Sequence, residues 1–258
     1  MRYSKVALAL AAAGCAFAMM ATSAFGATTK EFYAAPLGKT KGLSVGPQKI
    51  EFGPVKITCQ KAVGKGAQGE SPSKTFGTSI QFSMCATEAK IGTHPIELAT
   101  HFKTPVAIEY HNNHFVEIGS ETVEEQGSVK LAGGEVELVI NGGPKFKCYI
   151  SWPTQTLPTK AEKFPTEEFS LVEYINNEHE HKVTAKFPEG LQDRLIFKNE
   201  IKGIAHEFRE EEPGSGANCE EWGQNGGNFS KNGKYFGSVE QQIAGAELEY
   251  RTAEEEPF

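Results

Sequence analysis

Apolar and polar residues alternate along much of this chain, and such alternation is typical of strands that bury one face and expose the other. Thr, Val, Ile and Phe fill the alternating runs, whereas Gly, Pro and Asn fill the gaps between them. The runs with shared apolar faces are Val55/Ile57/Cys59, Ile80/Phe82/Met84, Val106/Ile108/Tyr110, Val136/Leu138/Ile140, Phe146/Cys148/Ile150/Trp152 and Ala246/Leu248/Tyr250.

Helical spacing is confined to short stretches, such as residues 160–164 and 167–172. Strands joined by short turns predict an all-β fold of mainly antiparallel strands, arranged as one or two β-sandwich-like units. The ten residues 64–73, rich in Gly and Ser, are expected to form a flexible loop between two strands.

Two segments of the chain recur, which suggests a tandem repeat. The segment 127–138 resembles 237–250, and 143–148 resembles 53–59. The repeat predicts a first β unit over residues 27–141 and a second over 142–258. Chance recurrence of turn residues is an equally open explanation.

Residues 1–26 have the three parts of a secretory signal peptide: two basic residues, an apolar run and small residues before the cleavage position. The run is too short for a spanning helix of about 20 residues, so we expect a chain that does not span the membrane. Lipid attachment at Cys15 is an alternative. The mature protein is therefore expected to be secreted, with association with the cell surface left open.

Four cysteines remain after this signal, and an even number in an exported protein indicates two disulfides. The repeat favours the pairs Cys59–Cys85 and Cys148–Cys219. Zinc is less suitable, because no two of the four cysteines have the short spacing of zinc ligands. Cys85 is out of phase with the apolar residues of its own strand, so a bulge or a strand end must intervene.

Without residues 1–26 the chain has 24 basic and 33 acidic residues, a net charge of −9 with His neutral. This sign disfavours nucleic acid and anionic membranes as partners, because both are bound by basic surfaces. Asp193 is the only aspartate in the chain, so the closely spaced Asp and Asn residues of typical calcium and magnesium sites are absent. No cofactor is expected.

Two pairs of histidines are weak candidates for a metal site: His111 with His114, and His179 with His181 beside Glu178. On a strand, His179 and His181 would project from the same face. The simpler interpretation is that the first pair flanks a hairpin turn and the second lies in a polar connector. A metal-holding envelope protein is therefore an alternative that needs a further ligand.

The metalloprotease motif His-Glu-x-x-His is absent from the sequence. No catalytic residue is assigned, and we expect a protein without enzymatic activity. A secreted glycan-active hydrolase with paired glutamates is the alternative. Glu97, Glu109 and Glu117 are available for it, although alternation places them on exposed faces.

Aromatic and amide side chains near the C-terminus are candidates for ligand binding. Trp222 and Asn225 lie in a Gly/Asn-rich segment, and Tyr235 follows. An exposed Trp or Tyr can stack on a sugar ring while amides bind its hydroxyls. Packing of Trp222 over its own loop is the alternative, and Trp152 is expected in the core.

The runs Thr75–Cys85, Pro105–Gly119 and Lys147–Pro153 resemble a group of secreted proteins from actinobacterial (high-GC Gram-positive) soil bacteria that occur as paralogous sets without an assigned activity. The resemblance implies an extracellular location and carries over no functional residue. Together these observations favour a non-enzymatic extracellular or cell-envelope binding or structural module. Its expected partner is a cell-wall polysaccharide or another surface protein.

Overall fold

The structure is a computed structural model that describes residues 30–91, 94–112, 114–118, 122–140, 147–160, 170–177, 194–210, 219–222, 229–243 and 247–252. The signal segment 1–26 and the expected unit boundary near residue 142 lie outside these ranges. The elements are β1 (Lys30–Ala35), β2 (Gly38–Phe52), β3 (Val55–Gln68), β4 (Thr75–Ile91), β5 (His94–Phe102), β6 (Val106–His111), β7 (His114–Ile118), β8 (Thr122–Leu131), β9 (Gly134–Ile140), β10 (Lys147–Trp152), β11 (Gln155–Lys160), β12 (Ser170–Asn177), β13 (Arg194–Glu210), η1 (Cys219–Trp222), β14 (Ser230–Ile243) and β15 (Glu247–Thr252).

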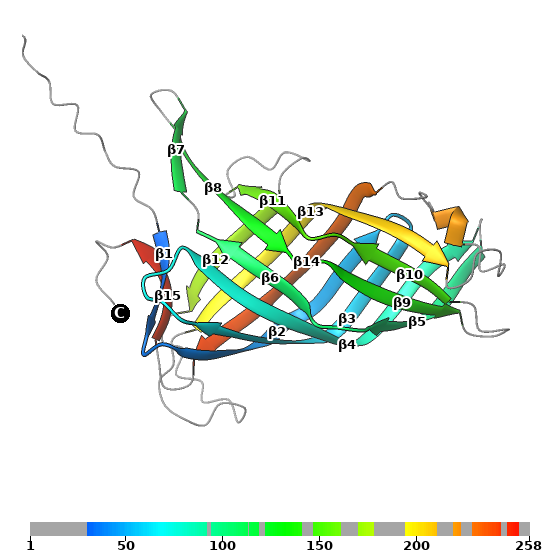
Figure 1. The fold of residues 1–258 in the computed structure, drawn as a ribbon, viewed down its shortest axis with the longest axis horizontal. Coiled ribbons are helices and arrows are strands. Elements are labelled where there is room, and N and C mark those ends of the chain that lie inside the picture. The colour runs from blue at the N-terminus through cyan, green and yellow to red at the C-terminus, as the bar shows by residue number, and fades with distance from the viewer. Residues whose placement is uncertain are drawn as a thin grey trace, which may run out of the picture.

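The expected sandwich is wrong, because the main sheet closes into a barrel (Figure 1). Eight strands form a ring in which each pairs antiparallel with the next, in the order β4, β3, β2, β14, β13, β10, β9 and β5. The ring closes because β5 pairs with β4. Alternation predicted buried faces such as Val55/Ile57/Cys59 correctly, although Met84 of the run Ile80/Phe82/Met84 is exposed. It does not say what a buried face packs against. A curled sheet that packs against itself satisfies the same pattern as two stacked sheets.

The barrel has two halves along its length, and five long strands, β2, β3, β4, β13 and β14, run through both. In one half, which we call the cap half, β5, β9 and β10 complete the wall. In the other, the plug half, β6, β8, β11 and β12 complete it. Because strands from both sides of residue 142 share this sheet, the tandem repeat is not confirmed.

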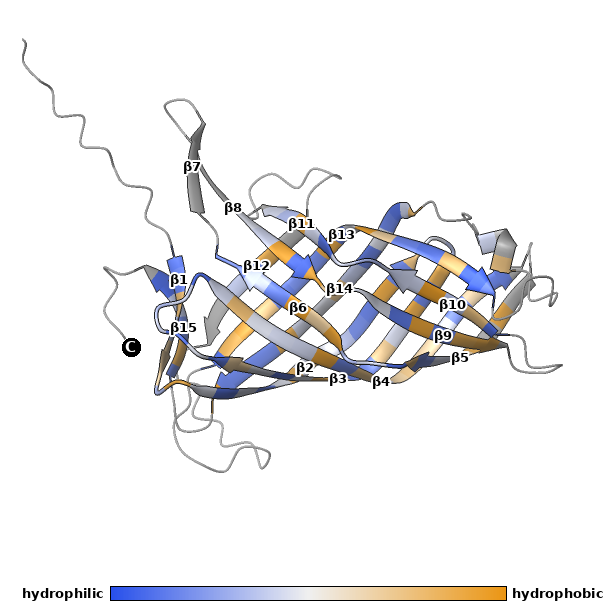
Figure 2. Cartoon of the chain, viewed as in Figure 1, coloured by the Kyte–Doolittle hydropathy of each residue, from blue (hydrophilic) through white to orange (hydrophobic). Residues whose placement is uncertain are grey.

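The wall has apolar side chains inside and polar ones outside, and Figure 2 shows these bands alternating along the strands. In β13, for example, Leu195, Phe197 and Ile201 are buried, while Lys198 between them is exposed. The core therefore fills the barrel, as expected for a closed sheet of about eight strands.

Regular strand structure is interrupted in every part of the wall near mid-length, in a belt that we call the waist. Register shifts occur in β2, β13 and β14. Short breaks separate β5 from β6, β8 from β9, and β10 from β11. The plug half contains one more wall strand than the cap half, so the wall has to change its register at this level.

Side chains take over several backbone hydrogen bonds at the waist. The amide of Gln155 accepts from the Ala205 N–H at 2.8 Å and donates to the Ala205 carbonyl at 3.2 Å. The Trp152 indole donates to the Ala132 carbonyl at 2.9 Å, and Gln48 donates to the carbonyls of Gly46 and Ser238. These contacts satisfy backbone groups that the interrupted ladder leaves without a strand partner.

A two-stranded ribbon of β1 and β15 closes the plug half. Phe32 of β1 is fully buried, and its ring contacts the rings of Phe76, Tyr174, Phe197 and Tyr250 at centroid distances of 4.9–6.1 Å. Its backbone also exchanges two hydrogen bonds of 2.8 Å with Ser73. Phe32 thus plugs the barrel end with an aromatic cluster.

The helix η1 closes the opposite end (Figure 1). Trp222 is 4% exposed and donates from its indole to the Lys90 carbonyl at 2.7 Å. The disulfide Cys148–Cys219 joins this helix to β10, and Cys59–Cys85 joins β3 to β4. Both predicted disulfides are confirmed.

Cys85 is out of phase with the apolar residues of its strand because the strand is irregular at Met84. This residue has a positive φ of 55° and is 63% exposed. On β3, Gln60 and Lys61 are likewise both exposed between the buried Cys59 and Ala62. Each strand therefore changes phase at the same level, and this irregularity brings the two opposed cysteines into register.

The glycine-rich segment that we expected as a loop is in part a strand. Residues 64–68 belong to β3, with Gly64 opposite Gly42 and Ile80. A Cβ at Gly64 would lie 2.3 Å from the Gln241 side chain, so glycine is required there by close approach rather than by chain flexibility.

No helix in the residues described above is long and apolar enough to cross a membrane.

Replacement of Phe32 by Ala should lower the free energy of unfolding by about 3–5 kcal/mol, because a buried ring in contact with four others leaves a cavity. Urea denaturation of the full mature chain measures this. Phe229→Ala, at a position 42% exposed, is the matched control and should change stability by at most about 0.5 kcal/mol. Equal effects of the two replacements would contradict the plug role.

A pH dependence is expected from His206, which is fully buried beside Phe52 and Phe208. Burial lowers the pKa of His206, and the bond to the Ile204 carbonyl opposes this only in part. The unfolded chain therefore binds the proton more readily, and stability is lost as pH falls below about 6.5.

In His206→Phe this contribution, at most about 1.4 kcal/mol per pH unit, should disappear. Urea unfolding of both proteins between pH 7.5 and 5 gives the difference in slope. Parallel profiles would show that His206 is not the responsible group.

Candidate functional site

A trough lies on the outer wall of the plug half, across β3, β4, β6 and β8. It holds about 370 Å³ for water-sized spheres, near the lower end of the range for small-ligand sites. Its lining consists of Lys65, Gly66, Gly77, Thr78, Ser79, Ala107, Ile108, Glu109, Lys130 and Ala132.

Small residues on adjacent strands explain why the wall is hollowed here. Gly77 and Ser79 of β4 lie opposite Glu109 and Ala107 of β6, and Ala132 follows β8. Inward and outward residues alternate, so these small residues share the outer face while their neighbours fill the core. A Cβ at Gly77 would have nothing within 4 Å. The floor is therefore made of short side chains and backbone.

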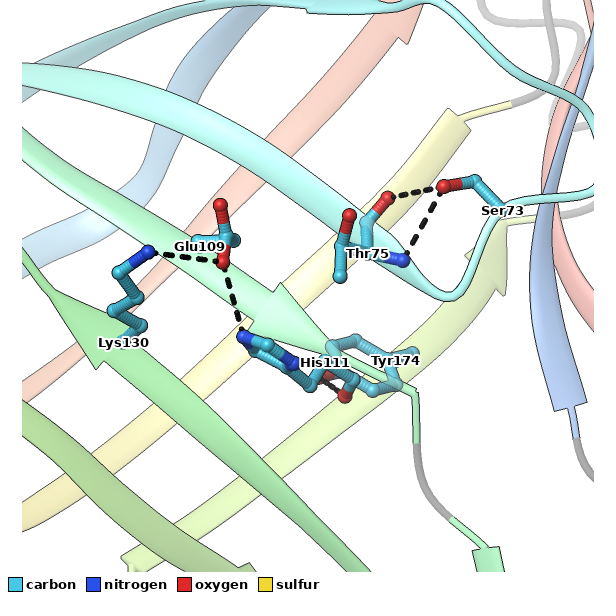
Figure 3. Close-up of polar contacts among 6 residues, drawn as sticks. All are labelled: Ser73, Thr75, Glu109, His111, Lys130 and Tyr174. Carbon is cyan, nitrogen blue, oxygen red and sulfur yellow. Dashed lines mark hydrogen bonds and ion pairs between the residues drawn. The ribbon is translucent and has the colours of Figure 1, made fainter.

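Charged residues form the rim. Glu109 Oε1 lies 3.1 Å from His111 Nε2 and 3.6 Å from Lys130 Nζ (Figure 3). All three side chains are 35–50% exposed, so a ligand can reach them. Lys65 stands on the β3 side of the trough.

The end of β6 is held from inside the barrel. The Tyr174 hydroxyl on β12 donates to the His111 carbonyl at 2.9 Å, and the Asn112 N–H donates to the Lys74 carbonyl at 2.7 Å (Figure 3 shows Tyr174). Ser73 bonds both the carbonyl and the N–H of Thr75 at the start of β4. The strands that carry the rim are thus fixed at this end.

The trough offers both kinds of hydrogen-bonding group. Glu109 accepts, the ammonium groups of Lys65 and Lys130 donate, and the Ser79 hydroxyl can do either. Such a set suits a ligand with many hydroxyls. Only one carboxylate, Glu109, is among the lining residues, whereas glycoside hydrolysis uses two.

A second charged cluster on the outer wall is already occupied by its own partners. Glu135 bonds both Lys103 and Arg209, and both cations lie over the ring of Tyr149. Partial burial opposes ionisation of Glu135, but its bonds to the two cations hold its pKa below the ordinary value. We interpret this cluster as a brace between β9, β10 and β13.

The expected aromatic ligand contacts are in the core. Trp222 packs against Phe208 at a ring distance of 6.0 Å and has no exposed face for a sugar. Tyr235 is 4% exposed, and its hydroxyl donates to Gln48 at 2.7 Å. Asn225 lies outside the described residues. Glycine-rich surroundings suggested an exposed loop around Trp222, whereas the disulfide at Cys219 draws this segment onto the barrel end.

Of the four candidate metal ligands, only the side chain of His111 is described, and it pairs with Glu109. His179 and His181 lie outside the described residues. The hairpin expected between His111 and His114 does not form, because β7 pairs with β8 whereas β6 pairs with β4 and β8. Within the described ranges, no three His, Cys, Asp or Glu side chains gather as metal ligands would.

Sequence reasoning missed Lys65, Ser79 and Lys130 as site residues. Each looks like an ordinary exposed residue of a strand, and only the pairing of β3, β4, β6 and β8 brings them together. The small residues that point outward, such as Gly77, Ser79 and Ala107, were the one available signal for a hollow in the wall. They can be interpreted only when the strand register is known.

Comparison with known proteins gives no relative: no protein-family model, curated protein or solved structure matches the chain.

Proposed function

We propose that this protein is a non-enzymatic extracellular binding module that holds a neutral cell-wall polysaccharide in the trough on its outer wall. The observation that carries the proposal is the trough itself: an open hollow in a paired wall, with a floor of short side chains and both donors and acceptors on its rim. Sites for ligands are commonly held by rigid scaffolds in this way.

The predicted secretory signal and the two disulfides support an extracellular location, because disulfides persist in oxidising compartments. The net charge of −9 expected for the mature chain favours a neutral polymer over an acidic one, since like charges repel. Hydroxyls of the sugar would donate to Glu109 and accept from Lys65 and Lys130. Single-site contacts of this kind are weak, and a repetitive polymer compensates through multiple attachment.

The test is co-sedimentation of the purified mature protein with insoluble cell-wall polysaccharide, using a variant that fills the trough. Gly77→Leu places a side chain on the open floor, where its Cβ has no other atom within 4 Å, so we expect the fold to be retained. Binding should weaken about tenfold or more, the loss of about 1.4 kcal/mol.

Gly69→Leu is the matched control, because a Cβ at Gly69 also meets nothing within 4 Å and Gly69 does not line the trough. It should bind as the wild type does. Equal binding by Gly77→Leu and wild type would move the site away from the trough. Failure of the wild type to sediment with any wall fraction would reject a polysaccharide ligand.

A further inference from the structure

A second cavity lies inside the barrel at the waist. The centre of a water-sized sphere can reach about 30 Å³ of space in it. Every lining side chain is apolar or aromatic, and the ring residues among them are Phe52, Phe82, Phe102, Trp152 and Tyr235. A space of this composition excludes water and accepts apolar molecules.

The rings that line the cavity pack against one another in pairs. Phe52 and Trp152 stack at 5.7 Å with an interplanar angle of 17°, and Phe82 meets Tyr235 edge-on at 5.8 Å. The hydroxyl of Tyr235 is engaged by Gln48, so its ring contributes only an apolar surface. Aromatic faces thus form much of the lining, and an aromatic ligand can pack against them in the same way.

The wall beside this cavity is not continuously paired. On its β5/β6 side, β4 pairs with β6 up to Ile80 and with β5 from Thr87 onward, so residues 81–86 have no strand partner there. The segment opposite, residues 103–105 between β5 and β6, is exposed. We call this gap in the ladder the seam.

Two rings close the seam from inside. Phe82 and Phe102 lie at a centroid distance of 5.0 Å, one on each side, and both line the cavity. Phe102 and Val106 are only partly buried, although the rest of the lining is in the core. Because no ladder bond spans the seam, these side chains can rotate toward the outer surface without breaking one.

We propose that the waist cavity is a binding site for a small apolar molecule about the size of one aromatic ring, which enters through the seam between residues 81–86 and 103–105. The cavity lies inside the wall and the trough outside it, with Ile108 lining both, and the cavity proposal does not depend on the polysaccharide proposal. A closed barrel of about eight strands is just wide enough for one small ligand among its core side chains.

The chain has two tryptophans, Trp152 in the cavity lining and Trp222 in the cap, so fluorescence can report binding. Iodobenzene is the probe, because its iodine quenches an indole that it contacts. Trp222→Phe leaves Trp152 as the reporter, and its emission should fall along a saturable curve. Trp152→Phe leaves Trp222, whose quenching should be weak and linear in concentration.

Val106→Phe fills the entrance and should weaken saturable quenching by at least about tenfold. Val63→Phe is the matched control on the outer wall, where Val63 is 38% exposed, and should bind as the parent does. Phe102→Ala removes one of the two closing rings and should accelerate binding. These three replacements are made in Trp222→Phe, and far-ultraviolet circular dichroism checks that each is folded.

Linear quenching of Trp152 without saturation would show that the cavity is only a packing void. Equal affinity of the Val106→Phe protein and its parent would reject entry and binding at this place. An iodine peak between Phe52 and Phe82 in crystals soaked with iodobenzene would place the ligand directly, and a peak only outside the barrel would overturn the proposal. Co-sedimentation with wall polysaccharide is measured separately, so either proposal can fail alone.

Discussion

Satisfaction of backbone hydrogen bonds at the waist is the constraint on which the rest of this barrel depends. A sheet whose wall gains a strand between one half and the other has to interrupt its ladder, and each buried group left without a partner costs about 1–3 kcal/mol. In this chain, side chains form hydrogen bonds with backbone groups in place of a neighbouring strand. Gln155 bonds both the N–H and the carbonyl of Ala205, and Trp152 reaches the Ala132 carbonyl. Glycine makes this possible, since a Cβ at Gly134 would lie 2.4 Å from the Trp152 ring.

Both candidate sites follow from the same interruption. Since β6 and β8 complete the wall only in the plug half, their small outward residues meet those of β4 and form the trough. Where β5 gives way to β6, residues 81–86 lose a strand partner, and the cavity lies behind them. A barrel with uninterrupted strands would have neither the seam nor the change of register. The waist therefore connects how the barrel closes with where it could bind.

Much of the fold could be predicted from local sequence, and much of the site could not. Alternation identified the buried faces of strands such as β10, and the two disulfides and the burial of Trp152 are confirmed. Alternation is a property of one strand, however, whereas the choice between sandwich and barrel depends on which strands pair over long distances in sequence. Alternation did not identify β13, whose buried face includes the polar residues Asn199 and His206. The trough escaped prediction for the same reason, because its residues come together only through strand register.

The position of Cys59–Cys85 connects this architecture with binding. Cys85 lies within residues 81–86, the part of β4 that lacks a partner on the seam side. A strand segment held on one side only should open locally more easily than its neighbours. The disulfide ties this segment to β3 at its far side, so the seam can loosen through Phe82 and Phe102 while the strand itself stays in register. Cys148–Cys219 fastens the single helical turn of η1 to β10 at the end of the barrel, where Trp222 also packs against Phe208. Cys59–Cys85 thus restrains a part of β4 that has a strand partner on one side only, and Cys148–Cys219 restrains a helical turn outside the sheet.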